Sequence, residues 1–179
     1  MKSSIRKKNI EKLNTLSDTT VKSNSKIINN RLIQFIQDNH IRYIGLYSPI
    51  EKEVDISDLS NHKMIKVYKP RYDMIKKMYE FSLFQINDHQ NIGRYNIPEP
   101  KGEIINTNKL ELIIVPGIGF DVSGNRLGRG KGYYDKLLTS YNGIKIGVCH
   151  DIQITDTIPV RKYDQKMNYL CTETKFLKF

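Results

Sequence analysis

The sequence has few of the residues that build cross-linked or metal-stapled folds, and it lacks a long apolar run. Cys149 and Cys171 are its only cysteines, too few for a disulfide framework or a four-ligand zinc site. Four histidines are scattered without the spacing of metal ligands: His40, His62, His89 and His150. Apolar runs such as residues 112–115 are too short to span a membrane, and no apolar stretch follows the charges of residues 1–8, which argues against a signal peptide. We therefore expect a reduced, cytoplasmic protein held together without disulfides or a structural metal.

The length and the charge of the chain limit its class further. A folded chain of 179 residues buries about 70% of the surface that it exposes when unfolded, so we expect a single domain over residues 1–179. Lys and Arg number 29 against 19 Asp and Glu, which gives a net charge of +10. Such an excess attracts nucleic acid, phosphates or polyacidic small molecules, but it also promotes solubility, so composition does not choose among them.

Helical and strand-like periodicities alternate along the chain. The pattern predicts helices over residues 5–16, over a segment that Ser23 or Ser25 caps and that reaches Ile36, and over residues 55–61 and 131–141. It predicts strands over residues 41–47, 64–68, 78–86, 110–115 and 145–149 and a final strand around residues 169–171, with loops over residues 87–107 and 116–130. This alternation indicates an α/β fold with a mainly parallel sheet and helices on both faces, in which ligands bind beyond the carboxyl ends of the strands.

The loop after the most apolar predicted strand is rich in glycine and in basic residues. Its glycines let backbone N–H groups face a ligand, and the start of the following helix adds further N–H donors. Arg126, Arg129 and Lys131 add three full charges, a combination typical of phosphate binding. The loop is not a Walker A motif, because Asn125 and Gly132 replace the required glycine and hydroxyl residue. The two-residue spacing of its last three glycines does not fit a dinucleotide fingerprint either.

Residues 115–135 resemble the signature of the 5-formyltetrahydrofolate cyclo-ligase family. That signature runs from an apolar strand through Pro-Gly, Phe-Asp, Gly and Arg-Leu-Gly to Gly-Tyr-Tyr-Asp, and the chain matches it throughout. The resemblance extends to further parts of the chain: residues 2–6, 25–32, 47–49, 53–55, 70–71 and 97–100, and Gln153, Pro159 and Asp164. The chain departs from the pattern at Asn96, Tyr163 and Asn168, all outside the glycine loop.

The resemblance implies a three-layer α/β/α sandwich that uses ATP and Mg²⁺ to convert 5-formyltetrahydrofolate into 5,10-methenyltetrahydrofolate, ADP and phosphate. The resemblance implies ATP and 5-formyltetrahydrofolate as partners, and we expect a monomer that binds no nucleic acid and no membrane. The ATP-binding residues would be Lys2, Ser3, Ser4, Ile5, Arg6, Arg126, Leu127, Gly128, Arg129, Gly130, Lys131, Gly132, Tyr133 and Tyr134. The folate-binding residues would be Arg6, Tyr47, Glu53, Arg129, Gly130, Lys131, Gly132 and Tyr133. Catalysis would fall to Arg129, Lys131 and Tyr133, and the metal ligands would be Asp135 and Asp164.

Two other functions are compatible with parts of the sequence. A basic RNA-binding module would explain the charge, although no strand with interleaved aromatic residues supports it. A sugar-phosphate isomerase on a related sandwich would use the same loop with Asp121 or Asp135 as its base, and it would need no ATP. The residues also leave open which of Tyr133 and Tyr134 contacts folate, and whether Asp164 binds the metal directly.

Overall fold

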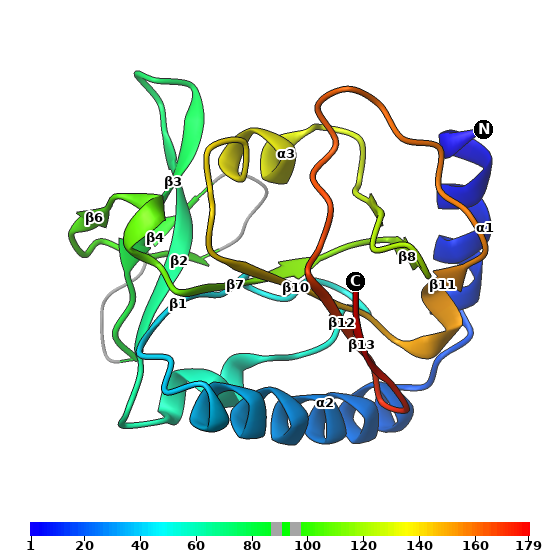
Figure 1. Ribbon diagram of the computed structural model, residues 1–179, viewed down its shortest axis with the longest axis horizontal. Coiled ribbons are helices and arrows are strands. Elements are labelled where there is room, and N and C mark those ends of the chain that lie inside the picture. Colours follow the sequence, from blue (N-terminus) through cyan, green and yellow to red (C-terminus); the bar gives the residue numbers. More distant parts are fainter. Residues whose placement is uncertain (87–90, 94–97) are drawn as a thin grey trace.

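A mixed sheet of eight strands forms the centre of the computed structural model, which describes residues 1–86, 91–93 and 98–179 (Figure 1). Its strands are β1 (Tyr43–Gly45), β2 (Lys66–Asp73), β3 (Met78–Leu83), β6 (Ile104–Ile105), β7 (Leu112–Pro116), β10 (Ile144–Val148), β12 (Tyr169–Cys171) and β13 (Phe176–Lys178). They lie in the order β13-β12-β10-β7-β1-β2-β3-β6. The five strands from β12 to β2 run parallel, and β13, β3 and β6 join in antiparallel pairs. The predicted α/β class with a mainly parallel sheet is confirmed.

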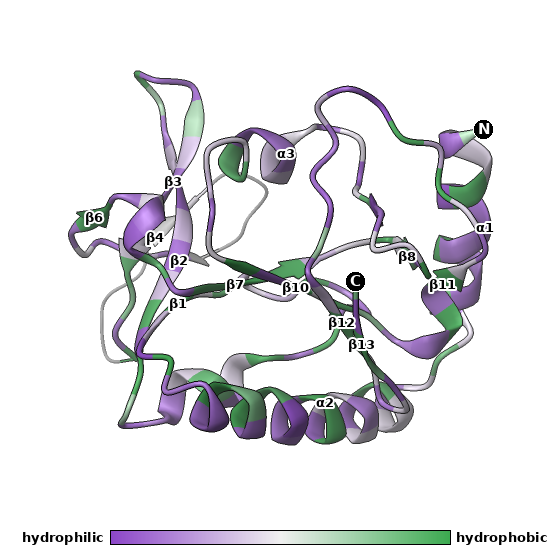
Figure 2. Cartoon of the chain, in the orientation of Figure 1, coloured by the Kyte–Doolittle hydropathy of each residue, from purple (hydrophilic) through white to green (hydrophobic). Residues whose placement is uncertain are grey.

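Helices cover both faces of this sheet. In Figure 1, α2 (Asp18–Asp38) lies below the sheet and the short helix α3 (Tyr133–Leu137) lies above it. One core cluster packs Ile28 and Leu32 of α2 against Leu112 and Ile114 of β7. The alternate residues of β7, among them Ile113, pack into a second cluster on the face of α3. Because β7 is buried on both faces, its residues 112–115 are all apolar, and β7 is green in Figure 2.

The helix α1 (Lys2–Asn14) lies at one end of the molecule, beside a second sheet of three short strands in the order β11-β8-β9. These strands are β8 (Gly119–Asp121), β9 (Arg126–Leu127) and β11 (Ile154–Thr155). The predicted continuous loop over residues 116–130 is therefore wrong, because part of it forms β8 and β9. Two-residue and three-residue strands leave too short a periodic pattern for the sequence to show them.

Several predicted boundaries also change. The second helix begins at Asp18 with Ser17 as its N-cap, whereas Ser25 is buried inside the helix and its hydroxyl accepts a hydrogen bond from the Asp55 N–H. Residues 57–61 form the 3-10 helix η1 (Ser57–Asn61), and α3 ends at Leu137. The strand β2 continues through Pro70, which is tolerated because β1 has already ended there and, among the described strands, β2 pairs at this point with β3 alone.

The chain contains further short elements. These are β4 (Asn91–Ile92), β5 (Pro98–Glu99), η3 (Thr107–Lys109) and η4 (Asp151–Gln153). The strands β4 to β6 fall in the predicted loop over residues 87–107, and β13 follows the strand that we expected to be the last. His89, Asn96 and Ile97 lie outside the described residues. In the part of the chain that the structure describes, none of the helices combines the length and apolar character that a transmembrane span needs.

Candidate active site

A cavity of about 730 Å³ lies where the parallel strands β1 and β7 end, as the topology predicts. The walls come from α1, the segment of residues 47–53, the glycine loop, the start of α3, the β2–β3 hairpin and residues 161–164. The cavity brings together most of the residues expected at the site: Lys2, Arg6, Tyr47, Glu53, Arg126, Gly128, Arg129, Gly130, Lys131, Gly132, Tyr133, Tyr134, Asp135 and Asp164. Four expected ATP contacts do not line it: Ser3, Ser4, Ile5 and Leu127.

A polar stripe attaches α1 to the rest of the site. The Arg6 Nε donates to the Gly128 carbonyl at 2.7 Å, and the Asn9 Nδ2 donates to the Ile118 and Gln153 carbonyls, both at 3.1 Å. Residues 2, 6 and 9 fall on one face of the helix, so Lys2 and Arg6 reach the cavity together while the intervening residues do not. The helix buries few apolar side chains, and polar contacts largely determine where it lies.

Gly130 and Gly132, between the loop and α3, adopt backbone conformations that L-residues avoid. Gly130 has φ of 100° and Gly132 has φ of 69°. The added Cβ of a residue at position 130 would lie 3.6 Å from the Arg6 guanidinium carbon, an ordinary contact, so the backbone conformation and not the available space requires glycine there. Because α3 has only five residues, its dipole contributes little here. The loop backbone and the basic side chains therefore supply most of the positive potential.

The most buried cation of the cavity is already paired. Arg126 has a side chain that is only 5% exposed, and its Nη2 donates to the Asp135 Oδ1 at 2.9 Å. Its Nη1 donates to the Pro116 carbonyl at 3.3 Å. Arg126 therefore fixes the Asp135 carboxylate at the cavity wall, a role that the sequence did not suggest.

The second carboxylate is held in a similar way. The Lys2 Nζ donates to the Asp164 Oδ2 at 2.5 Å, and the Arg161 N–H donates to the same oxygen at 2.6 Å. Burial would raise the pKa of Asp164, but the hydrogen bonds from Lys2 and from the Arg161 backbone outweigh it and hold the pKa below its ordinary value. Asp164 is therefore ionised at neutral pH.

The two carboxylates fit a magnesium ion that arrives together with a phosphate ligand. Mg²⁺ commonly takes one or two carboxylates and fills its remaining positions with phosphate oxygens and water. Asp135 and Asp164 supply this number of carboxylates at one cavity. Within residues 1–86, 91–93 and 98–179, no group of three or more His, Cys, Asp and Glu side chains could hold a metal by itself. The donor set does not fit a resident metal bound by protein groups alone.

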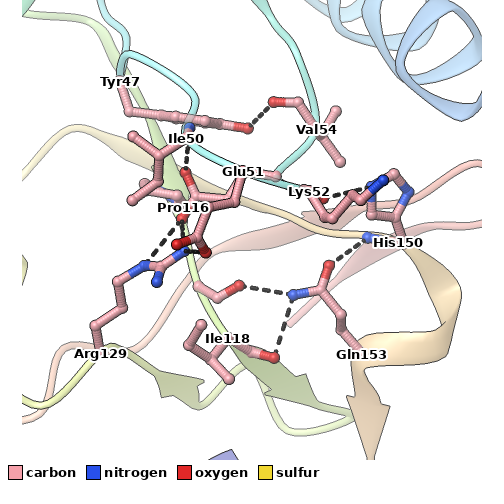
Figure 3. Close-up of polar contacts among 12 residues, drawn as sticks. Tyr47, Ile50, Glu51, Lys52, Val54, Pro116, Ile118, Arg129, His150 and Gln153 are labelled. Carbon is pink, nitrogen blue, oxygen red and sulfur yellow. Dashed lines mark hydrogen bonds and ion pairs between the residues drawn. The ribbon is translucent and has the colours of Figure 1, made fainter. Parts of the chain in front are cut away.

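An acidic pair faces Arg129, a partly exposed cation of the loop. The Arg129 Nη2 lies 3.2 Å from the Glu53 Oε1 and 3.3 Å from the Glu51 Oε2 (Figure 3). The side chain of Arg129 is 40% exposed, whereas that of Glu53 is 11% exposed. Burial raises the pKa of Glu53, and the opposing effect of Arg129 only partly offsets it. The side chain of Arg129 can therefore move away from Glu53 toward a bound anion, while Glu53 stays in place.

Aromatic side chains also line the cavity. The ring of Tyr79 lies edge-on to that of Tyr133, with centroids 5.1 Å apart. Tyr47 is buried, and its hydroxyl donates to the Val54 carbonyl at 2.6 Å, so this residue offers the cavity its ring. Because both basic and aromatic groups line the cavity, it suits a ligand pair of which one is polyanionic and the other is flat and aromatic.

Several lining residues lie outside the predicted site set, among them Tyr79, Glu99 and Arg161. Glu99 follows a proline within the segment that resembles the family, and this position could have indicated it. Tyr79 and Arg161 lie in a hairpin and an irregular segment, where the sequence carries no signal and only the fold brings them to the cavity.

Comparisons with known proteins agree with this geometry. The sequence model described as the 5-formyltetrahydrofolate cyclo-ligase family matches residues 1–173. The 5-formyltetrahydrofolate cyclo-ligase of Mus musculus is 31% identical over 147 residues, which cover 73% of this chain and 71% of the mouse protein. A protein of Schizosaccharomyces pombe named as a probable 5-formyltetrahydrofolate cyclo-ligase is 29% identical over 187 residues, covering 93% and 92% of the two chains. The NMR structure of Aquifex aeolicus 5,10-methenyltetrahydrofolate synthetase superposes with a TM-score of 0.89 at 30% identity, covering 99% of this chain and 92% of the other.

Proposed function

Because the chain belongs to the 5-formyltetrahydrofolate cyclo-ligase family, whose members act in folate one-carbon metabolism, we propose that it uses ATP and Mg²⁺ to convert 5-formyltetrahydrofolate into 5,10-methenyltetrahydrofolate. The γ-phosphoryl group of ATP passes to the formyl oxygen and ADP is released. N10 of the folate attacks the activated carbon and loses its proton, and the carbon–oxygen bond breaks as phosphate leaves. The single observation that carries the proposal is the cavity that gathers the loop cations and the two ion-paired carboxylates.

The basic side chains of the cavity would bind the triphosphate. Phosphoryl transfer needs positioning and charge stabilisation more than it needs covalent chemistry from the protein. Lys131 and Arg129 extend from the loop, and Lys2 and Arg6 face them from α1. Together they would hold ATP and offset the charge that develops on the transferred group. Arg126 would contribute indirectly, by holding Asp135.

Asp135 and Asp164 would hold the magnesium ion together with the phosphate oxygens. The bound ion would supply charge neutralisation on the transferred group. Asp164 is 2.5 Å from the Lys2 Nζ and Asp135 is 2.9 Å from the Arg126 Nη2, so the two carboxylates are ordered before any ligand enters. This preorganisation supports their assignment as metal ligands.

The acidic and aromatic side chains of the cavity would bind folate. The carboxylate of Glu53 can accept paired N–H donors from the edge of a pterin ring once Arg129 moves toward the phosphates. Tyr133 lies beside Tyr79 and can pack on the ring, whereas Tyr47 would contribute apolar surface.

We also propose that the chain acts as a single domain over residues 1–179 and as a cytoplasmic monomer. We propose that it binds no nucleic acid, because its site cations converge in a cavity instead of forming an exposed basic face.

Near-ultraviolet absorbance of the purified protein tests this proposal. With 5-formyltetrahydrofolate present, the methenyl chromophore should grow only when MgATP is added. The Asp135→Asn variant should lose at least about 10²-fold in kcat, because the γ-phosphoryl transfer loses a magnesium ligand. Asp156→Asn, which removes a charge from an exposed position, is the matched control and should behave as wild type. A flat trace from folded wild-type protein would refute the reaction, and normal turnover by Asp135→Asn would refute the metal assignment.

A further inference from the structure

His150 lies outside the cavity wall and contacts the segment that carries Glu51 and Glu53. His150 follows β10 at the start of η4, and its side chain is completely buried, with 0% exposure. Figure 3 shows its ring beside Lys52, the residue between the two glutamates that face Arg129. The distance from the His150 Nε2 to the Lys52 carbonyl oxygen is 3.2 Å.

The hydrogen-bond partners of His150 determine its tautomer. The Lys52 carbonyl can only accept, so the Nε2 must carry the proton. The Nδ1 lies 3.2 Å from the Asn24 Nδ2, which can only donate. The orientation of the Asn24 amide is fixed in turn, because the same Nδ2 donates to the Glu173 carboxylate at 3.0 Å. His150 is therefore neutral, and burial lowers its pKa below the ordinary 6.5.

The segment that His150 supports holds a strained turn. Glu51 has φ of 50°, a left-handed conformation that is unfavourable for a residue with a side chain. The turn is closed by a hydrogen bond from the Glu53 N–H to the Ile50 carbonyl at 3.0 Å. Such conformations persist only where surrounding contacts maintain them. The His150 bond to Lys52 is a contact of this kind, from a different part of the chain.

The short helix η4, for which His150 is the N-cap, also fixes the glycine loop. The Gln153 Oε1 accepts from the His150 N–H at 2.9 Å. The Gln153 Nε2 donates to the carbonyls of Gly117 and Ile118, at 2.8 and 3.1 Å. The turn η4 therefore ties the segment that carries Glu51 and Glu53 to the start of the loop that carries Arg129.

We propose that His150 is a positioning residue, whose imidazole holds the Lys52 carbonyl so that the strained turn presents Glu51 and Glu53 to the cavity. It does not touch the reacting groups, and it acts on folate binding through Glu53. This role rests on the proposed function, because it assigns Glu53 to the folate side of that reaction.

The test compares two replacements of His150. His150→Gln places an amide N–H near the position of the Nε2 donor, whereas His150→Phe fills the space without a donor. We expect His150→Phe to raise the KM for 5-formyltetrahydrofolate about tenfold with kcat within about twofold of wild type. His150→Gln should restore most of this loss. The control variant His62→Phe changes the histidine that follows η1 and does not line the cavity, and it should leave both constants unchanged.

Equal KM values for wild type and His150→Phe, or an equal rise in both His150 variants, would overturn the proposal. Long-range ¹H–¹⁵N spectra of the wild-type imidazoles at pH 7.5 give a readout that needs neither turnover nor a folded variant. The spectra should show His150 as the Nε2–H tautomer, and an Nδ1–H tautomer or a charged ring would also overturn the proposal. Absence of methenyl product from wild type would instead refute the proposed function, and the spectra would still report on the hydrogen bond.

Discussion

Replacing Asn9 by Asp tests whether the polar stripe of α1 controls access to the nucleotide side of the site. The side chain of Asn9 is 1% exposed, and its Nδ2 donates to two carbonyls at 3.1 Å. Aspartate has the same shape but replaces this donor with an oxygen, so both hydrogen bonds are lost. The carboxylate oxygen then faces two carbonyl oxygens, whose partial charges have the same sign. Each bond contributes about 0.5–1.5 kcal/mol, which makes the combined loss roughly 1–3 kcal/mol.

That loss falls on the docking of α1 more than on the rest of the fold. Leu13 is the only apolar residue of α1 that is buried, and burial of a leucine contributes about 1.5–3 kcal/mol. The polar contacts add amounts of similar size, which are opposed by the entropy of ordering the helix. A loss of about 2 kcal/mol therefore releases α1 for a substantial fraction of the time. Because Lys2 and Arg6 leave with it, we expect the KM for ATP to rise about tenfold.

Steady-state kinetics and hydrogen exchange measure the two halves of this argument. Amide exchange over residues 2–14 should accelerate in Asn9→Asp, while the amides of β7 and β10 keep their protection. Asn14→Asp makes the same chemical change at an exposed position of the same helix, and it should match wild type. The reasoning is refuted if the two variants have the same KM for ATP and the same exchange. It is also refuted if exchange accelerates equally throughout the chain, because α1 would then not open separately.

Two further variants test single groups of the cavity. Arg161→Ala should raise the KM for ATP about threefold to tenfold without a change in Tm, because the side chain lines the cavity but is exposed; its neighbour Lys162→Ala is the control, and equal kinetics of the two variants would remove Arg161 from the site. Glu53→Gln should raise the Tm by a few degrees at pH 7.5 and raise the KM for 5-formyltetrahydrofolate at least tenfold. Burial raises the pKa of Glu53 above its ordinary 4.5, so its contribution to stability is present below pH 4.5 and is lost as the pH rises through the folded-state pKa. Thermal melts at pH 4 and pH 7.5 should therefore show a stabilising effect only at the higher pH, and a lower Tm at pH 7.5 would contradict this account.

The sequence was most informative where its pattern is long. The strand β7 has four successive buried residues, and the long helix α2 repeats its apolar face over several turns, so both were found. The pattern failed where tertiary contacts decide. The strand β2 passes through Pro70 because of the strand order, and the N-terminal part of α2 is polar, so its true cap at Ser17 was not recognised.

The candidate site shows the same division. Motif spacing predicted that the loop cations would meet a ligand, but it could not show that Arg126 is already bound to Asp135 or that Arg129 pairs with Glu53. These pairs join residues from separate elements or neighbouring turns, and their geometry depends on how the elements pack. His150 gave no signal at all, because its role arises from a contact with a residue 98 positions away.

The attachment of α1 has a consequence for the order in which the site is completed during synthesis. This helix leaves the ribosome before the groups that receive it: Ile118, Gly128, Gln153 and Asp164. The contact between Lys2 and Asp164 spans 162 positions, which takes roughly 8–32 s at elongation rates of about 5–20 residues per second. During that interval the groups that α1 contacts are not yet available, and its weakly apolar surface gives it little tendency to collapse onto other segments. The cavity therefore closes only when nearly the whole chain has emerged, and a nascent chain that stops before residue 153 cannot form the nucleotide side of the site.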